Sequence, residues 1–283
     1  MGAVSLDYAA PDAALRDYVS LFYEFRADVE LFEDVERADL AQFRFMLSGE
    51  GEIQFADGHV QHASGPILIG PTTGMTKISI RGPIHVFGFG LLPAGWGALI
   101  GIGASTLVNR VVDATQLFGQ RLHLIADDLR AAPSFDAKVA IGAAFASDLA
   151  ARTHHDSLDF TRIVDNWLAA TFSPEVDCLV ETCGLSRRQV ERNCKKLYGA
   201  PPKVLARKYR ALRAAVTLAR GDVDVQDVVS EGFYDQSHMI REIKHFTGVT
   251  PRQMREDTPA LTRLTMRRAE LADQVADPNI WET

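Results

Sequence analysis

The chain has 283 residues, of which 47% are hydrophobic and 24% charged, an ordinary composition for a soluble globular protein. At roughly 150 residues per domain, this length predicts two domains. The net charge of −7 argues against a protein that is basic throughout, but the charge is unevenly distributed. Residues 1–157 carry 11 Lys and Arg against 19 Asp and Glu, whereas residues 158–256 carry 16 against 13. This asymmetry indicates a mildly basic binding module beside an acidic domain.

The sequence favours a cytoplasmic protein that does not enter a membrane. Its N-terminus, MGAVSLDYAAP, lacks a basic stretch followed by an apolar run, so we expect no secretory signal. Cys178, Cys183 and Cys194 are odd in number and lack zinc-site spacing, which favours reduced thiols. The interval 82–109 has no Asp, Glu, Lys or Arg, but its seven glycines and two prolines suit a buried sheet better than a membrane helix.

The first half of the chain has the pattern of a β domain. Short apolar or aromatic runs are bounded by turn signals such as Asp57-Gly58 and Gly70-Pro71. Many short strands at this spacing predict a barrel or a jelly-roll sandwich. From about Thr115 the apolar period changes to that of amphipathic helices. The expected strands include residues 21–25, 42–47, 52–55, 67–69, 76–80 and 85–91.

Aromatic side chains of this half are candidates for the lining of an apolar effector pocket, with a few polar side chains as anchors. The alternative is that most of them form the core of the domain. The candidates for the pocket are Phe22, Arg44, Phe45, Gln54, His85, Phe87 and Trp96.

Catalytic and metal chemistry have little support. The histidines of the strand region, His59, His62 and His85, have no carboxylate at the spacing of a cupin metal motif, so we expect no metal and no cofactor. Cys178 and Cys194 fall at helix-core positions, where cysteine is usually inert. We expect no enzyme, since no nucleophile has a nearby base. The alternative is a cupin-like enzyme or ligand-binding protein whose helical module serves assembly.

An internal repeat dominates the second half. Shifted by 49 positions, residues 176–202 overlay residues 225–251. Under this shift Arg192 meets Arg241, and the lysines, glycines and prolines that follow are matched as well. Two copies with a helical period indicate a duplicated supersecondary unit.

Each copy has the pattern of two helices joined by a tight turn. A short amphipathic segment leads to a glycine, Gly184 in the first copy and Gly232 in the second, which lets the chain reverse at low cost. Ser186 or Asp235 then serves as an N-cap, and Gln189 completes a capping box in the first copy. A helix of about three turns follows and ends at Gly199 or Gly248. This is the helix-turn-helix pattern, in which the second helix reads DNA.

The outward faces of these second helices carry side chains suited to DNA. Arg can bond bidentately to guanine, Gln to adenine, and Glu can accept from cytosine, while Lys suits phosphates. A solvated face is the alternative for one such helix, but two copies with matched caps and charges favour DNA recognition. The expected contacts are Arg187, Arg188, Glu191, Arg192 and Lys195 in the first copy, and Gln236, Ser237, His238, Arg241 and Lys244 in the second.

The segment GFYDQSHMIR at 232–241, followed by FTGVTP at 246–251, resembles the signature of AraC/XylS-type regulators. The first copy resembles that family's first unit, and residues 210–215 are similar to the helix that joins its two units. The resemblance covers about residues 160–256 and implies that both recognition helices enter successive major-groove segments. More diffusely, it implies a cupin-like effector domain in the first half. Cys194 and Ile243 stand where the family usually has Phe, which leaves the DNA face unchanged.

The sequence thus predicts two domains, an N-terminal, mainly β, cupin-like sandwich or barrel with flanking helices, and a C-terminal all-α domain with two helix-turn-helix subdomains joined by a long helix. We expect a sequence-specific transcription regulator that binds double-stranded DNA. Further candidate partners are a small-molecule effector, a second copy of the chain and, for an activator, RNA polymerase. The expected boundaries are 1–153 for the effector-sensing or dimerisation domain, 154–158 for a linker, 159–256 for the DNA-binding domain and 257–283 for a helical tail that either caps the second lobe or contacts the N-terminal domain.

Overall fold

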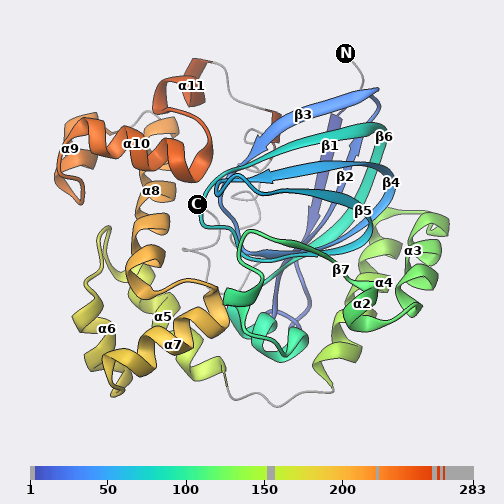
Figure 1. The fold of residues 1–283 in the computed structure, drawn as a ribbon, viewed down its shortest axis with the longest axis horizontal. Helices are drawn as coiled ribbons and strands as arrows, with labels where there is room; N and C mark the ends of the chain where they lie inside the picture. Colours follow the sequence, from blue (N-terminus) through green and yellow to red (C-terminus); the bar gives the residue numbers. More distant parts are fainter. Residues whose placement is uncertain (1–3, 152–156, 221–222, 257–259, 262–263, 265–283) are drawn as a thin grey trace.

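The computed structural model describes residues 4–151, 157–220, 223–256, 260–261 and 264. The N-terminal half is a curled antiparallel sheet with helices on one face, and the C-terminal half is helical (Figure 1). The two-domain fold class expected from the sequence is therefore confirmed. Among the described residues, no helix combines the length and the apolar character needed to cross a bilayer.

The sheet has seven strands and curls because its longest strand has two different neighbours on one edge. Strand β6 pairs with β3 through residues 76–81 and with β2 through residues 84–91. On its other edge β6 pairs with β4, whose register shifts at Ser48 and bends the sheet further. The result is a half-open barrel. The strands are β1 (Val4–Ala9), β2 (Val19–Ala27), β3 (Leu31–Glu36), β4 (Ala41–Phe55), β5 (Val60–Ile69), β6 (Thr76–Leu91) and β7 (Val111–Asp113).

The two faces of the sheet belong to two separate cores. Phe22, Phe43 and Phe89 are fully buried between the sheet and the helices, with the rings of Phe43 and Phe89 stacked at 5.4 Å. Tyr23 and Phe25 face the interior of the barrel, because successive residues of a strand point to opposite faces. The helical segments of this half are α1 (Pro93–Gly95), the π-helix η1 (Trp96–Ile100), the 3-10 helix η2 (Ala104–Thr106), α2 (Thr115–Phe118), α3 (Arg121–Ala131) and α4 (Phe135–Ala150).

The C-terminal half consists of two similar helical units joined by one long helix. Its helices are α5 (Leu158–Ala170), α6 (Val176–Cys183), α7 (Arg187–Tyr198), α8 (Pro202–Arg220), α9 (Val225–Ser230), α10 (Gln236–Thr247) and α11 (Pro251–Glu256). Figure 1 shows α7 and α10 near opposite ends of α8. The duplication expected from the 49-residue shift is present, since α6–α7 and α9–α10 are matched pairs.

The predicted helix ends are confirmed in detail, with one exception. Ser186 accepts a hydrogen bond from the Gln189 backbone and forms a complete capping box, and Asp235 caps α10. Both second helices end at a glycine with positive φ, 80° at Gly199 and 81° at Gly248. The exception is Gly232, which is not among the described residues with positive φ.

Gly232 has a different physical role from the one expected. A Cβ atom built at this position would lie 2.8 Å from Cδ of Arg210 on α8. A side chain here would force the Arg210 side chain of α8 to shift, whereas the counterpart Gly184 does supply a left-handed turn, with φ of 61°.

The expected linker and tail fall largely outside the described residues. Residues 154–156 are not described, and α5 begins at Leu158 directly after its N-cap Ser157. Within the expected tail at 257–283, only Ala260, Leu261 and Leu264 have described side chains. The domain boundaries therefore stay predictions.

Candidate DNA interface and effector cavity

Each helix-turn-helix unit holds its second helix on a small apolar core. Val190 and Cys194 of α7 are fully buried, and Met239 and Ile243 occupy the matching positions of α10, as the sequence predicted. Burial raises the pKa of the Cys194 thiol to about 12. The thiol therefore stays protonated and unreactive, and it serves to fill the core. These buried faces fix which sides of α7 and α10 point to solvent.

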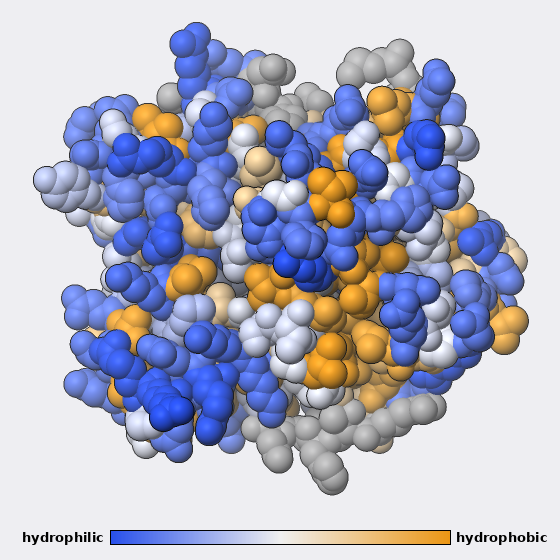
Figure 2. Space-filling model, in the orientation of Figure 1, coloured by the Kyte–Doolittle hydropathy of each residue, from blue (hydrophilic) through white to orange (hydrophobic). Residues whose placement is uncertain are grey.

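The solvent-facing sides carry the side chains expected to contact DNA. Glu191 and His238 are half-buried, and the rest are exposed. In Figure 2, hydrophilic residues gather over the lower left of the molecule, where Figure 1 places α6 and α7. The exposed candidates are Arg187, Arg188, Arg192 and Lys195 on α7, and Gln236, Ser237, Arg241 and Lys244 on α10.

Two of the ten candidates are already engaged within the protein. The guanidinium of Arg187 forms an ion pair with Asp177 of α6. The ring of His238 accepts a hydrogen bond from the Tyr234 backbone N–H at Nδ1, 3.3 Å away, and lies edge-on to Phe233 at 5.7 Å. His238 thus helps to shape the turn of the second unit. The side chains of Arg192, Lys195, Arg241 and Lys244 are exposed and have no hydrogen-bond or ion-pair partner among the described residues. 

An ion-pair network locks α10 against α8. The buried carboxylate of Glu242 accepts hydrogen bonds from Nε and Nη2 of Arg207, at 3.0 and 2.8 Å. Arg210 approaches the same carboxylate at 4.0 Å. Burial raises the pKa of Glu242, but its bonds with Arg207 outweigh that effect and hold the pKa below its ordinary value. The long helix therefore sets the orientation of the second recognition helix.

The β domain contacts the C-terminal ends of both recognition helices. A Cβ atom on Gly199, at the end of α7, would lie 2.7 Å from Pro71 and Val108. At the end of α10, the Phe246 carbonyl accepts a hydrogen bond from the Ala38 backbone at 2.6 Å. Equivalent ends of the two units thus rest on one rigid surface, which leaves their N-terminal turns facing away from it.

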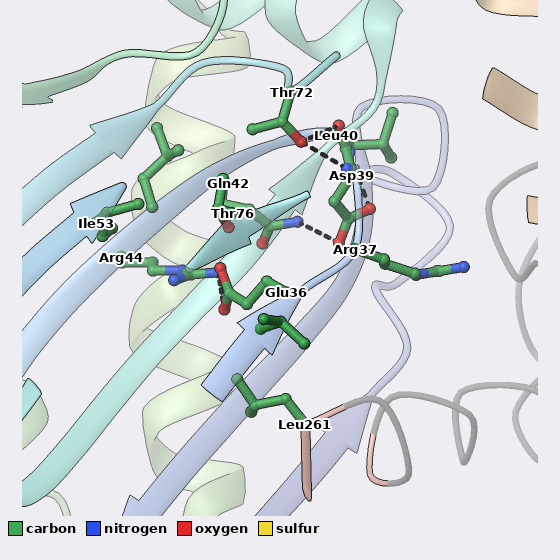
Figure 3. Close-up of a pocket in the computed structure, with 12 residues that line it drawn as sticks. Glu36, Arg37, Asp39, Leu40, Gln42, Arg44, Ile53, Thr72, Thr76 and Leu261 are labelled. Atoms are coloured by element: carbon green, nitrogen blue, oxygen red, sulfur yellow. Dashed lines mark hydrogen bonds and ion pairs between the residues drawn. The ribbon is translucent and has the colours of Figure 1, made fainter. Parts of the chain in front are cut away.

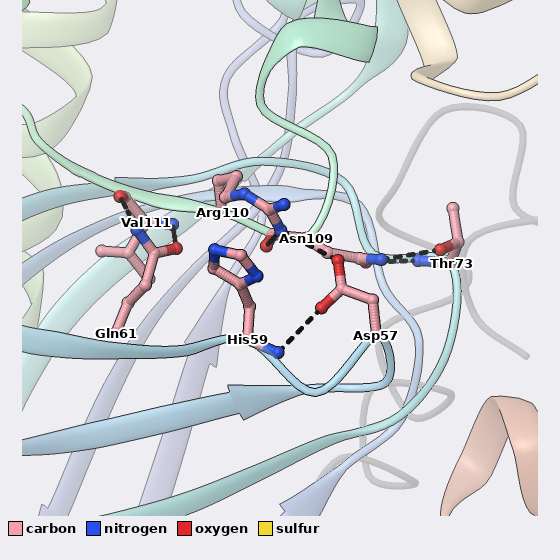
Figure 4. A network of polar contacts seen from close by, with 7 residues as sticks. All are labelled: Asp57, His59, Gln61, Thr73, Asn109, Arg110 and Val111. Carbon is pink, nitrogen blue, oxygen red and sulfur yellow. Dashed lines mark hydrogen bonds and ion pairs between the residues drawn. The ribbon is translucent and has the colours of Figure 1, made fainter.

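A polar network stiffens the loop that touches α10 (Figure 4). The side chain of Asn109 bonds to Thr73 twice, accepting from its backbone N–H at 3.0 Å and donating to its hydroxyl at 2.9 Å. Arg110 pairs with Asp57 at 2.9 Å and so joins the neighbouring turn to the same network. The carbonyl of Thr73 in turn lies 3.0 Å from Nε2 of His245 on α10. The network therefore joins the β domain to the second unit.

A buried lysine links α8 to the β domain. Nζ of Lys208 donates to the carbonyl of Asp39 at 2.7 Å and to that of Thr72 at 3.1 Å. The side chain is buried, and desolvation lowers its pKa to about 8. The helix that joins the two units is thus bonded to the segments just before β4 and just after β5.

The interior of the barrel encloses an apolar cavity of about 70 Å³, and a more polar one of about 40 Å³ adjoins it at the end near α8. The two share Glu36, Arg44, Ile53 and Leu261. Figure 3 shows the polar end, where Arg44 pairs with Glu36 at 2.9 Å. Arg44 also donates to the Tyr23 hydroxyl at 2.9 Å.

The structure brings only one of the seven candidate pocket residues to this cavity. Arg44 lines it, and Gln54 is exposed on the outer side of β4. The four aromatic candidates lie in the core between sheet and helices, on the opposite face, so the core interpretation holds for them. These four are Phe22, Phe45, Phe87 and Trp96.

His85 lies on that same helical face, in a buried charged cluster. Its Nε2 is 2.6 Å from the carboxylate of Glu24, which also pairs with Lys138 of α4 at 3.2 Å and with Arg26 at 3.1 Å. Burial raises the pKa of Glu24, but the hydrogen bonds from these three side chains outweigh it and lower the pKa below its ordinary value. The cluster fastens α4 to the sheet and has no access to the barrel interior.

Several residues of the site were missed in the sequence. Gln42 and Leu261 line the cavity, and Lys208 bonds the two halves, but none has a local pattern that marks it. Tyr234 is 92% exposed in the turn before α10, where an exposed aromatic beside a predicted N-cap is a usable signal for a DNA or partner contact. Among the described residues, no three His, Cys, Asp or Glu side chains are grouped as metal ligands.

Two capped helix-turn-helix units, presenting basic faces at two ends of one helix and resting on a β domain, define a DNA-binding protein of the helix-turn-helix class. Comparison with known families agrees. Residues 179–257 match a family described as "Helix-turn-helix domain", and residues 8–113 match a "Domain of unknown function (DUF6597)". The C-terminal region is thus an AraC-type helix-turn-helix domain, as the sequence motifs indicated.

Individual relatives match more narrowly. The F1 operon positive regulatory protein of Yersinia pestis is 38% identical over 81 residues, which cover 28% of this chain and 27% of that protein. The chain thus spans about a quarter of the length of the curated relative that it matches.

Among solved structures, ToxT from Vibrio cholerae O395 is 11% identical with a TM-score of 0.43, covering 81% of this chain and 99% of that one. A ToxT structure with a bound unsaturated fatty acid is 10% identical with a TM-score of 0.41, covering 79% and 94%. With such scores these structures are only loosely similar to the chain.

Proposed function

We propose that the chain is a sequence-specific DNA-binding transcription regulator that acts in the cytoplasm and catalyses no reaction. The observation that carries this proposal is the repetition of one exposed face on two recognition helices. Arg192 and Lys195 on α7 have counterparts in Arg241 and Lys244 on α10, all exposed. One rigid helix, α8, separates the two faces, an arrangement suited to successive major-groove segments of one duplex.

Within this proposal the exposed side chains have separate roles. Arg192 and Arg241 read bases, since a guanidinium bonds bidentately to guanine. Lys195 and Lys244 contact phosphates and set the salt dependence. Glu191 accepts from a cytosine amino group. Arg188, Gln236 and Ser237 extend the two faces at their N-terminal turns, whereas Arg187 and His238 contribute through the geometry of their turns.

The β domain is proposed to bind a small-molecule effector in the barrel cavity, with Arg44 at its polar end. The support is the position of that end. The polar end is formed in part by Asp39 and Thr72, whose carbonyls accept hydrogen bonds from Nζ of Lys208 on α8. A molecule that changes this end of the barrel therefore acts on the helix that holds both recognition helices.

A second copy of the chain is a further proposed partner, and so is RNA polymerase for an activator. Light scattering, which measures the mass of the particle in solution, tests whether a second copy of the chain binds.

Fluorescence anisotropy with a labelled duplex from the region flanking the chain's own coding sequence tests DNA binding. Arg241→Ala is expected to cost about 1–3 kcal/mol and to relax one base position. Lys195→Ala is expected to weaken binding to all sequences alike and to lower the salt slope by about one. Arg81→Ala serves as the control, because Arg81 is an exposed arginine of the β domain. An Arg241→Ala protein with unchanged affinity and preference would contradict the role given to that residue.

A further inference from the structure

The polar end of the barrel cavity holds a buried hydrogen-bond acceptor, the side-chain oxygen of Gln42. Gln42 of β4 is only 4% exposed and lines the polar end of the cavity. Its Nε2 donates to Oδ2 of Asp39 at 3.3 Å, which fixes the orientation of the amide (Figure 3). Its Oε1 has no hydrogen-bond partner among the described residues. A buried carbonyl oxygen without a donor is costly, so this position suits a bound molecule that donates a hydrogen bond.

The charges at this end balance one another. The ionisable side chains that line it are two acids, Glu36 and Asp39, and two arginines, Arg37 and Arg44. Arg44 is committed to Glu36 and to the Tyr23 hydroxyl. An anionic ligand would have to displace Glu36 from Arg44 and leave a half-buried carboxylate without its partner. The site therefore favours an uncharged molecule.

The rest of the cavity is apolar, and the side chain of Leu261 forms part of its wall. Tyr23, Phe25, Ile53 and Ile78 contribute to its walls. Leu261, which follows the second helix-turn-helix unit, is 6% exposed and belongs to the same core cluster. Its backbone N–H donates to Oδ2 of Asp34 on β3 at 2.9 Å, which holds the segment against the edge of the barrel.

Leu261 limits what the cavity accepts. The apolar part encloses about 70 Å³, enough for water but below the roughly 150 Å³ of an engineered cavity that holds benzene. A molecule larger than benzene therefore needs more room, which an outward movement of the Leu261 side chain would supply. Because Leu261 is joined through α11 to the second unit, such a molecule also frees that unit from one attachment to the β domain.

We propose that the barrel takes an uncharged, largely apolar molecule that donates one hydrogen bond to Oε1 of Gln42, and that Leu261 occupies part of its site until the molecule binds. This inference rests on the proposed effector role of the β domain. It names the chemical class of the effector and the segment that it displaces.

Three probes of similar length separate the alternatives by isothermal titration calorimetry on the full chain at pH 7.5. They are 1-octanol, which donates a hydrogen bond, 1-methoxyheptane, which has the same number of heavy atoms but no donor, and octanoate, which is charged. We expect 1-octanol to bind about three- to tenfold more tightly than 1-methoxyheptane, the ratio for one net hydrogen bond. Octanoate is expected to bind at least about tenfold more weakly than 1-octanol.

Two variants test whether the probes bind at Gln42 and whether Leu261 competes with them. Gln42→Leu is expected to bring 1-octanol down to the affinity of 1-methoxyheptane. Leu261→Ala is expected to raise the affinity for both uncharged probes, whereas Leu124→Ala, an exposed leucine of α3, leaves it unchanged. If Gln42→Leu fails to fold, the order of the affinities of the three probes for the unmodified chain still tests the proposal.

Three results would overturn the proposal. They are octanoate as the tightest probe, equal affinity for 1-octanol and 1-methoxyheptane, and no binding to either the unmodified chain or Leu261→Ala. Fluorescence anisotropy with the labelled duplex, on the same preparations, distinguishes failure of this ligand proposal from failure of the proposed DNA-binding function. Intact sequence-selective DNA binding with any of these results rejects only the ligand class, while loss of DNA binding in the unmodified chain rejects the regulator role.

Discussion

Replacement of Lys208 by methionine tests the bond between α8 and the β domain. Lys208 is 5% exposed, and its ammonium donates to the carbonyls of Asp39 and Thr72. Desolvation lowers its pKa from 10.5 to about 8, which corresponds to roughly 3 kcal/mol against the charged form. Its two hydrogen bonds to backbone carbonyls limit that cost, which would be larger for a buried ammonium without acceptors.

The substitution removes both the desolvation cost and the two bonds, so its net effect depends on the acceptors left behind. The carbonyl of Asp39 still accepts from the Thr72 backbone at 3.2 Å, but the carbonyl of Thr72 loses the donor described for it. One buried carbonyl without a partner costs about 1–3 kcal/mol. We expect Lys208→Met to lower the free energy of unfolding by that amount at pH 7.

The pH dependence has a definite sign. Since the pKa of Lys208 is lower in the folded chain than in the unfolded one, the unfolded chain binds more protons between about pH 8 and pH 10.5. The unmodified protein therefore gains stability across this window as its lysine becomes neutral, and Lys208→Met lacks that gain.

Urea unfolding at pH 7, 8, 9 and 10 measures the difference between the two proteins. We expect the advantage of the unmodified chain over Lys208→Met to grow above pH 8. Lys203→Met, at an exposed lysine of the same helix, should follow the unmodified chain at every pH. A difference that stays constant from pH 7 to pH 10 would refute the assigned burial and pKa of Lys208.

Three further substitutions probe the units and the sheet. Ser186→Ala removes the capping box of α7 and is expected to cost about 1 kcal/mol in thermal unfolding, whereas Ser237→Ala, at an exposed serine without a cap bond, should cost almost nothing. Ile243→Ala empties a fully buried site in the second unit and is expected to cost about 2–5 kcal/mol, visible as a lower urea midpoint; a loss under 1 kcal/mol would contradict its packing. Glu24→Gln leaves the Lys138 ammonium buried without its partner and is expected to cost roughly 3–5 kcal/mol at pH 7. Because the pKa of Glu24 is lowered in the folded chain, its contribution is present above about pH 4.5 and disappears as the pH falls further, so the variant should lose less stability in acid.

The recognition helices were predictable because their determinants are local. Caps, terminal glycines and a helical apolar period all act within about a dozen residues, and the repeat supplied each of them twice. The buried positions Val190 and Ile243 and the exposed Arg192 and Arg241 follow from that period alone. Even here one local inference was wrong. Gly232 does not supply a left-handed turn but lies against the Arg210 side chain of α8, a contact that no neighbouring residue reveals.

The cavity was not predictable in the same way. Phe45 and Arg44 are adjacent on one strand and therefore face opposite sides of the sheet, yet both were candidates for one pocket. A period of two separates the faces, but strand pairing decides which face becomes the interior of the barrel. The register of β4 with β6 and the curl of the sheet place Gln42 and Arg44 inside, with Phe43 and Phe45 against the helices.

The sequence by itself determined two helix-turn-helix units, their caps and the side chains that they expose, because short-range hydrogen bonding and periodicity specify a helix and its faces. Tertiary structure alone decided how those units rest on the β domain. Lys208 meets Asp39 across 169 positions and Leu261 meets Asp34 across 227. Contacts over such separations depend on the packing of the whole chain, and they are the ones that connect the cavity to the DNA-binding faces.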